Sequence, residues 1–216
     1  MFERREVKTT AYLLISSDTG LAGPYNSNVF KRFEQLVQEE ENYLVWTIGR
    51  KAYSYIKGKK YPLINTSPLL IRDDVMYVDI VPIAKQIVEA YLSGEIDRIV
   101  IVYNHFVNSL NIEVRDEVLL PIEPINNSNI ETEYLFEGGI ENIVDEIMPM
   151  YIQAVVYGII LDAKISEHSS RMNAMKNATD NAKEVIDKLQ ILYNRARQNA
   201  ITTELIDIIA GANAVE

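Results

Sequence analysis

The sequence has 216 residues and a net charge of −10, with no cysteine and two histidines. An acidic chain without a basic block is not expected to bind a nucleic-acid backbone. The lack of cysteine excludes disulfides and thiolate metal sites, and two histidines leave little material for a zinc site, so no metal is expected. Residues 1–8 are charged, and the most apolar run, 152–161, is too short to cross a bilayer, so we predict neither a signal peptide nor a transmembrane segment.

The first part of the chain is predicted to alternate strands and helices, because short apolar β-rich runs are separated by turns and by one-sided apolar segments. The predicted elements begin with strand 9–16, a helix capped by Asn26 or Ser27, strand 43–48 and helix 50–56, which ends at 58–60. The segment 69–79 is ambiguous, and residues 75–80 within it suit a short edge strand. The elements that follow are helix 81–92, which ends at Gly94, strand 98–103, strand 109–120, an extended piece 134–136 and a short helix 140–148. In strand 109–120, Leu110, Ile112 and Val114 alternate with polar residues, which predicts a half-exposed antiparallel edge strand.

This alternation predicts an α/β fold with a mostly parallel sheet and an antiparallel edge strand over residues 1–139. Residues 140–216 are predicted to contain the short helix and then one very long C-terminal helix. The reason is that the stretch 149–212 has no proline after Pro149 and, before its end, no glycine other than Gly158. At roughly 1.5 Å per residue such a helix is about 90 Å long.

Small and apolar residues recur along the long helix at alternating steps of four and three, which is the 3.5-residue period of a coiled coil. We call this row the seam; it consists of Met175, Thr179, Ala182, Ile186, Leu189, Tyr193, Ala196, Ala200 and Thr203. Isolated helices draw most of their stability from a packed face, so the seam predicts a partner helix.

Three places in the α/β domain carry residue types that chemistry could use. The loop 20–23 lacks the spacing of a phosphate loop, and Pro24 removes a backbone donor, so a tight turn is favoured over nucleotide binding. Asp18 follows the first strand, where α/β enzymes place function, but no acidic cluster accompanies it and a turn-forming role is favoured. His105 follows another strand and could act as a general base, but without an identifiable nucleophile a polar loop residue is favoured.

The long helix also carries polar residues that need an interpretation. His168 is interpreted as a packed or partner-facing residue rather than a catalytic one. Asn173, Asn177 and Asn181 recur every four residues, which fits either a solvated face or a face in polar contact with a surrounding partner. The residues therefore indicate no catalytic constellation and no cofactor.

The C-terminal part of the chain carries a specific pattern. Residues 201–214 match Ile-Thr-x-Glu-x-x-Asp-x-x-x-Gly-Ala-x-Ala at every position, and the stretch 166–182 precedes them in the same helix. The turn 18–28 and the triplet 119–121 fit the same family. By these motifs the chain resembles the gamma subunit of the F-type ATP synthase along its whole length.

The resemblance implies a Rossmann-like foot domain over 1–139 and a C-terminal helix that forms the shaft of the central rotor, with no cofactor and no catalytic residue. In that family the foot sits on the membrane c-ring with the epsilon subunit, and the shaft turns inside the ring of catalytic alpha and beta subunits. Proton flow thereby drives ATP synthesis. The resemblance also implies contacts with the catalytic ring at Arg171, Arg197, Gln198, Thr202 and Glu204, and contacts with the c-ring or epsilon subunit at Tyr134 and Glu137.

The family begins with a long N-terminal helix that pairs with the C-terminal one, whereas this sequence starts just before its first predicted strand. We therefore expect a truncated gamma subunit whose seam lacks its usual partner, so that the isolated chain self-associates. Two alternatives are a truncated gamma that self-associates without a rotor role, and an α/β enzyme or ligand-binding domain with a coiled-coil tail. Because the cysteine pair of plant-type members is absent, we expect a bacterial enzyme, peripheral at the cytoplasmic face of the plasma membrane.

Overall fold

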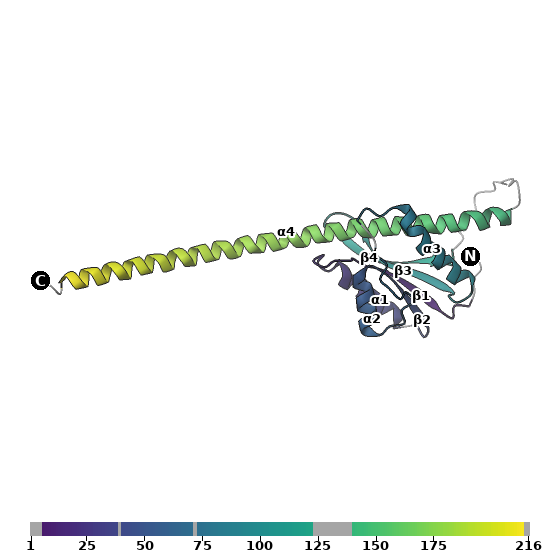
Figure 1. Cartoon of the computed structure of the whole chain (residues 1–216), viewed down its shortest axis with the longest axis horizontal. Helices are drawn as coiled ribbons and strands as arrows, with labels where there is room; N and C mark the ends of the chain where they lie inside the picture. Colours follow the sequence, from purple (N-terminus) through teal and green to yellow (C-terminus); the bar gives the residue numbers. More distant parts are fainter. Residues whose placement is uncertain (1–5, 39, 71–72, 123–139, 214–216) are drawn as a thin grey trace. The chain divides into compact units, whose positions relative to one another are not determined.

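The computed structural model describes residues 6–38, 40–70, 73–122 and 140–213, and Figure 1 shows its elements. In chain order the elements are β1 (Thr10–Ile15), α1 (Tyr25–Val37), β2 (Tyr43–Ile48), α2 (Arg50–Lys59), α3 (Tyr77–Leu92), β3 (Arg98–Phe106), β4 (Ile112–Leu120) and α4 (Ile140–Asn213). The chain divides into two compact units, Met1–Met172 and Asn173–Glu216, and α4 contributes to both. The strands and helices α1 to α3 belong to the first unit.

The four strands form one open sheet in the order β2-β1-β3-β4. Strand β1 pairs in parallel with β2 on one side and with β3 on the other, and β4 pairs antiparallel with β3 at the edge. At the centre of the sheet, Leu13 lies opposite Trp46 of β2 and Ile101 of β3. This arrangement confirms the predicted α/β fold with a mostly parallel sheet, an antiparallel edge strand and a very long C-terminal helix.

Helices cover both faces of the sheet, which is why every residue of β1 is buried. On one face Leu13 belongs to a core with Ile87 of α3 and Ile160 of α4. On the other face Tyr12 belongs to a core with Phe33 of α1 and with residues of α2. The first unit therefore has three layers, with α1 and α2 on one side of the sheet and α3 and the first part of α4 on the other (Figure 1).

The segment between α2 and α3 differs from the prediction. Residues 75–80 do not form an edge strand, because α3 already begins at Tyr77. Its first turn is closed by the Asp79 carboxylate, which accepts a hydrogen bond at 3.0 Å from the backbone N–H three residues earlier. Leu63 and Leu69 instead form single parallel bridges with β2. An apolar run this short fits either a strand or a helix, and its packing against the sheet and α4 decided the outcome.

The predicted ends of α1 and α2 were also partly wrong. Neither Asn26 nor Ser27 caps α1, because the helix already begins at Tyr25 and the Asn26 side chain is hydrogen-bonded to Ser17. Helix α2 does not stop before Gly58 but continues through it for one further residue. In both places the residue type suggested a helix end, and the observed end lies one or more residues away from it.

Strand β4 is the predicted antiparallel edge strand, but it begins later than expected. It starts at Ile112, and Leu110, which was predicted to face inward, is 81% exposed. Ile112 and Val114 are half-buried as the alternation predicted. The alternating pattern holds within the strand and fails in the turn that precedes it.

Helix α4 is longer than predicted. The separate short helix over 140–148 does not exist, because one helix runs from Ile140 through Pro149 to Asn213. Proline removes one backbone hydrogen bond inside a helix. Here the turns that follow Pro149 bury Ile152 and Val156 completely in the core on the sheet, which offsets that loss.

Part of α4 is long and apolar enough to cross a membrane by length and composition alone. The tested span, Glu146–Gly211, contains an 18-residue window with a mean hydropathy of 1.2, and 33% of that window is buried inside the structure. A helix that packs on a sheet core meets the same criterion, so this observation is weak support for a membrane span. The predicted absence of a transmembrane segment remains a prediction.

Candidate functional site

The carboxyl ends of β1 and β3 are the place where open parallel sheets hold their ligands. In this chain the loop after β1 is used to build the neighbouring helix. The Asp18 Oδ1 accepts a hydrogen bond from the Arg50 N–H at 2.9 Å, and the Ser16 Oγ accepts one from the Ala52 N–H at 2.8 Å. These two side chains satisfy donors at the start of α2 that have no partner within the helix.

The same loop is held in shape by polar contacts of its own. Asn26 Oδ1 accepts from the Ser17 N–H at 3.0 Å, and its amide nitrogen donates to the Ser17 hydroxyl at 2.8 Å. Leu21 and Gly23 have positive φ angles of 62° and 54°. The loop is thus a tight turn, as its glycines predicted. The carboxylate of Asp18 bonds to the start of α2, and its predicted turn-forming role stays a prediction.

Helix α4 crosses this end of the sheet and is joined to it by hydrogen bonds that we call the helix clamp. The Ser170 hydroxyl donates to the Ala22 carbonyl oxygen at 2.6 Å, and the Tyr25 hydroxyl donates to the Ala163 carbonyl oxygen at 2.9 Å. Asn104, at the end of β3, donates to the Tyr25 carbonyl oxygen at 2.9 Å. These contacts join α4 and the start of α1 to the carboxyl ends of β1 and β3.

A second part of the clamp joins α4 to the end of β3. Asp162 accepts a hydrogen bond from the Phe106 backbone N–H at 2.9 Å, and its other oxygen lies 2.5 Å from Nδ1 of His105. A few turns later the Ser169 hydroxyl donates to the Ser109 carbonyl oxygen at 3.0 Å. The prediction of a polar loop residue is wrong for His105, because β3 continues to Phe106 and so includes it; its ring is engaged with a carboxylate on the long helix.

Charged residues of α4 complete the clamp. Glu167 is 3% exposed, and its carboxylate lies 2.7 Å from Arg171 and 3.4 Å from Lys164, so the buried charge is compensated by two cations. Arg171 also donates to the Thr19 hydroxyl at 3.0 Å. His168 Nε2 lies 3.7 Å from an Asp73 carboxylate oxygen, but the His168 side chain is 51% exposed, so it is not packed in the core and a contact with a partner stays a prediction.

The electrostatic environment of the clamp keeps Tyr25 protonated. Burial, and after it the Glu167 carboxylate, raise the pKa of the Tyr25 hydroxyl well above its usual range. A protonated hydroxyl is the form that can donate to the Ala163 carbonyl. The contact is therefore present at neutral pH and does not depend on a titration there.

The positions predicted to contact a catalytic ring divide between the two units. Arg171 lies in the clamp of the first unit, where its side chain is 24% exposed and already has intramolecular partners. Arg197, Gln198, Thr202 and Glu204 lie in the second unit and are exposed. The Thr202 hydroxyl donates to the Gln198 carbonyl oxygen at 2.8 Å, one turn earlier in the same helix. Tyr134 and Glu137 lie outside the described residues.

The seam is exposed along the second unit. Met175, Ile186, Leu189 and Tyr193 are 42–63% exposed, and the alanines of the row are exposed as well: Ala182, Ala196 and Ala200. Within the described residues of this unit the row is therefore not covered, and its pairing with a partner helix stays a prediction. Asn177 and Asn181 are exposed on the same stretch of helix.

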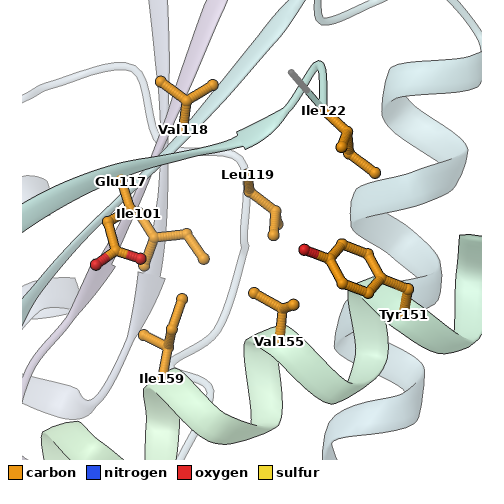
Figure 2. A pocket seen from close by; sticks show the side chains of 8 residues that line it. All are labelled: Ile101, Glu117, Val118, Leu119, Ile122, Tyr151, Val155 and Ile159. Carbon is orange, nitrogen blue, oxygen red and sulfur yellow. The ribbon is translucent and has the colours of Figure 1, made fainter. Parts of the chain in front are cut away.

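A cavity of about 230 Å³ lies between β3, β4 and α4, and Figure 2 shows the side chains that line it. Val155 and Ile159 of α4 point toward Ile101 and Leu119, and the Tyr151 ring lies beside them. The cavity is lined by Ile101, Glu117, Val118, Leu119, Ile122, Tyr151, Val155 and Ile159. The carboxylate of Glu117 already accepts a hydrogen bond from the Tyr103 hydroxyl at 2.8 Å. Six of the eight lining side chains are aliphatic, and the polar side-chain groups of the lining are those of Glu117 and Tyr151.

Two further cavities of the described residues have other linings. One of about 460 Å³ contains Arg32, Glu40, Arg98 and Asp116, whose charges are paired as Arg32–Asp116 and Arg98–Glu40. The other, of about 410 Å³, lies near the amino ends of the strands. None of the three described cavities is lined by Asp18 or His105. Within the described part of the chain, no three His, Cys, Asp or Glu side chains gather as metal ligands.

Comparison with known proteins identifies the family. A family model described as ATP synthase matches residues 1–215. The chain is 41% identical to the ATP synthase gamma chain of Macrococcus caseolyticus over 223 aligned positions, which cover 100% of this chain and 77% of that protein. This chain belongs to the ATP synthase gamma chain family. It is also 40% identical to the gamma chain of Exiguobacterium sibiricum, over 99% of this chain and 76% of that protein.

Solved structures agree with the gamma-chain fold. A chain of the Tetrahymena thermophila mitochondrial ATP synthase, from its central stalk and c-ring, is 24% identical with a TM-score of 0.66 and covers 82% of this chain and 79% of its own length. A chain from the Euglena gracilis mitochondrial ATP synthase is 18% identical with a TM-score of 0.70 and covers 97% of this chain and 73% of its own length. At these identities the likeness establishes the fold.

Sequence reasoning found the family motifs but missed what some of their residues do. The turn 18–28 was recognised as a family motif, but no residue type in it indicated that the Ala22 carbonyl and the Tyr25 hydroxyl form hydrogen bonds with the long helix. Asp162 and Ser170 were not singled out at all. The available signal was their spacing, since 162, 166 and 170 follow one another at four-residue steps and so lie on one face of α4.

Proposed function

We propose that this gamma-chain family member is a non-catalytic rotor subunit of the F-type proton-transporting ATP synthase, which couples proton-driven rotation to ATP synthesis in the catalytic head. The observation that carries the proposal is the likeness to gamma chains over 99–100% of this sequence and 76–77% of theirs. The helix clamp supports it, because a long helix that transmits rotation must be fixed to the domain that turns with it. The α/β ligand-binding alternative is not favoured, since the crevice near Asp18 and His105 serves protein contacts.

The partners follow from the family. We propose that the second unit contacts the alpha and beta subunits through Arg197, Gln198, Thr202 and Glu204, whose polar side chains are exposed and can form charge-assisted hydrogen bonds. Arg171 adds a contact near the clamp. Residues 1–139 form the foot, which contacts the c-ring or epsilon subunit through Tyr134 and Glu137. The complex then lies peripherally at the cytoplasmic face of a bacterial plasma membrane.

Co-purification with the cognate alpha and beta subunits tests this function. The wild-type chain should be recovered in the complex, and a double substitution of Arg197→Ala and Glu204→Ala should lower both its recovery and the ATP hydrolysis of the complex. Glu184→Ala with Lys188→Ala is the matched control, because it removes an exposed pair of opposite charges from the same helix. Failure of the wild-type chain to co-purify would refute the rotor proposal.

A second proposal concerns the isolated chain. We propose that it associates with a second copy through the seam, because Ile186, Leu189 and Tyr193 expose about 60% of their surface to water on the second unit. Burying an apolar row against a second helix is favourable at about 25 cal/mol per Å² of apolar surface. Light scattering of the purified chain at micromolar concentration should give a mass above that of the monomer. A monomeric mass would contradict self-association but leave the rotor proposal intact.

A further inference from the structure

Asp162 makes an unusual connection between α4 and the sheet. One of its carboxylate oxygens accepts from the Phe106 backbone N–H at 2.9 Å, and the other lies 2.5 Å from Nδ1 of His105. Both partners are at the end of β3, where that strand pairs with β4: His105 lies opposite Glu113 and Phe106 lies opposite Ile112. The carboxylate therefore binds the main chain of a sheet strand. The main chain of a paired strand is far less mobile than a surface side chain.

The other contacts between α4 and the first unit are of two kinds. The hydrogen bonds of Ala163, Ser169 and Ser170 reach residues outside the strands, whereas those of Asp162 reach a strand itself. The second kind is apolar. Ile152, Val156 and Ile160 pack against the sheet core, but apolar contacts are non-directional. They resist separation of the helix from the sheet more than rotation of the helix about its own axis. A carboxylate that accepts two hydrogen bonds has directional preference and fixes both the position and the rotation of the helix.

The surroundings of Asp162 strengthen this attachment. Its side chain is 24% exposed and that of His105 is 28% exposed, so water competes only partly for these hydrogen bonds. The negative charge of Asp162 contributes to the raised pKa of both Tyr25 and Tyr103, after larger contributions from burial and from other partners. Asp162 is thus directed inward, among groups of the sheet end.

We propose that Asp162 is the positioning residue through which turning force passes between the long helix and the sheet domain. The proposal rests on the rotor function proposed above and deepens it by naming the point of attachment. Asp162 takes no part in chemistry; it prevents α4 from slipping against β3 when the helix is loaded. Loss of the carboxylate should weaken the transmission of rotation while leaving the catalytic subunits able to hydrolyse ATP.

Amide hydrogen exchange of the purified full chain tests the attachment directly. In Asp162→Ala the Phe106 amide should exchange about tenfold to a hundredfold faster than in the wild type, the ratio expected for losing a hydrogen bond to a charged group. Asp162→Asn should fall between the two, because its side-chain oxygen can still accept from Phe106. Glu89→Ala, which removes an exposed carboxylate from α3, should leave the exchange unchanged.

The coupling of the assembled complex tests the mechanical role. In membrane vesicles, Asp162→Ala should lower the number of protons pumped per ATP hydrolysed, whereas ATP hydrolysis itself and the Glu89→Ala control should remain as in the wild type. A purely structural role would reduce assembly, hydrolysis and pumping together. Unchanged exchange at Phe106, or faster exchange with unchanged coupling, would overturn the inference. A wild-type chain that never assembles would instead refute the rotor function on which the mechanical role rests.

Discussion

Gly49 provides the sharpest test of how the first unit is built. It lies between β2 and α2 with φ of +92°, and a Cβ added there would lie 2.2 Å from the Ser16 carbonyl oxygen and 2.6 Å from the Ser16 Oγ. That same Oγ accepts from the Ala52 N–H at 2.8 Å and so helps to begin α2. Gly49→Ala would therefore strain the backbone and push the end of β1 away from the start of α2.

The expected loss of stability is large. Placing alanine at a positive φ costs about 1–2 kcal/mol, and disturbing the helix start and a buried hydrogen bond raises the total to about 3–6 kcal/mol. Gly58→Ala is the matched control in the same helix, because a Cβ at Gly58 meets nothing within 4 Å. Replacing a helix-interior glycine by alanine should stabilise the chain by about 0.5–1 kcal/mol.

Urea unfolding followed by the fluorescence of Trp46 measures both effects. Trp46 is the single tryptophan of the chain, and it is 5% exposed in the core that Leu13 and Ile101 share. Its signal therefore reports the first unit rather than the long helix of the second. A Gly49→Ala protein within about 1 kcal/mol of the wild type, or equal in stability to Gly58→Ala, would refute this account of the turn.

Three further substitutions test other parts of the structure. Tyr25→Phe removes the hydrogen bond to the buried Ala163 carbonyl and should lower the free energy of unfolding by about 1–3 kcal/mol in the same urea experiment. Ionisation of Tyr12 should lower the free energy of unfolding at high pH, because burial and then the Glu40 carboxylate raise the pKa of its hydroxyl from 10.0 to about 12. The unfolded chain ionises first, so the stability advantage of the wild type over Tyr12→Phe is full below pH 10 and should shrink as the pH rises toward 12; a constant difference across that range would contradict the cause given. Leu189→Asp places a charge on the exposed seam and should return the isolated chain to a monomeric mass in light scattering, with no change in Trp46 fluorescence.

The sequence predicted those elements whose local pattern had one physical interpretation. Strands β1 and β3 are apolar runs covered on both faces, and β2 was placed with the same bounds that the structure has. The long helix followed from the scarcity of breakers, and its exposed apolar row followed from the 3.5-residue period. Elements with mixed signals were missed: residues 75–80 suited a strand, and Pro149 suggested a boundary where the helix continues.

What the sequence determined by itself was the order of elements, the family motifs and the presence of a helix too long for a compact domain. Only the tertiary structure decided that Asp18 accepts a hydrogen bond from Arg50 at the start of α2, that His105 binds Asp162, and that α4 is joined by hydrogen bonds to the carboxyl end of the sheet. The clamp joins residues 138 and 148 positions apart, as in Tyr25 to Ala163 and Ala22 to Ser170. Local periodicity and turn chemistry act over a few residues, so contacts at such separations arise only when the sheet and both of its helix layers have assembled.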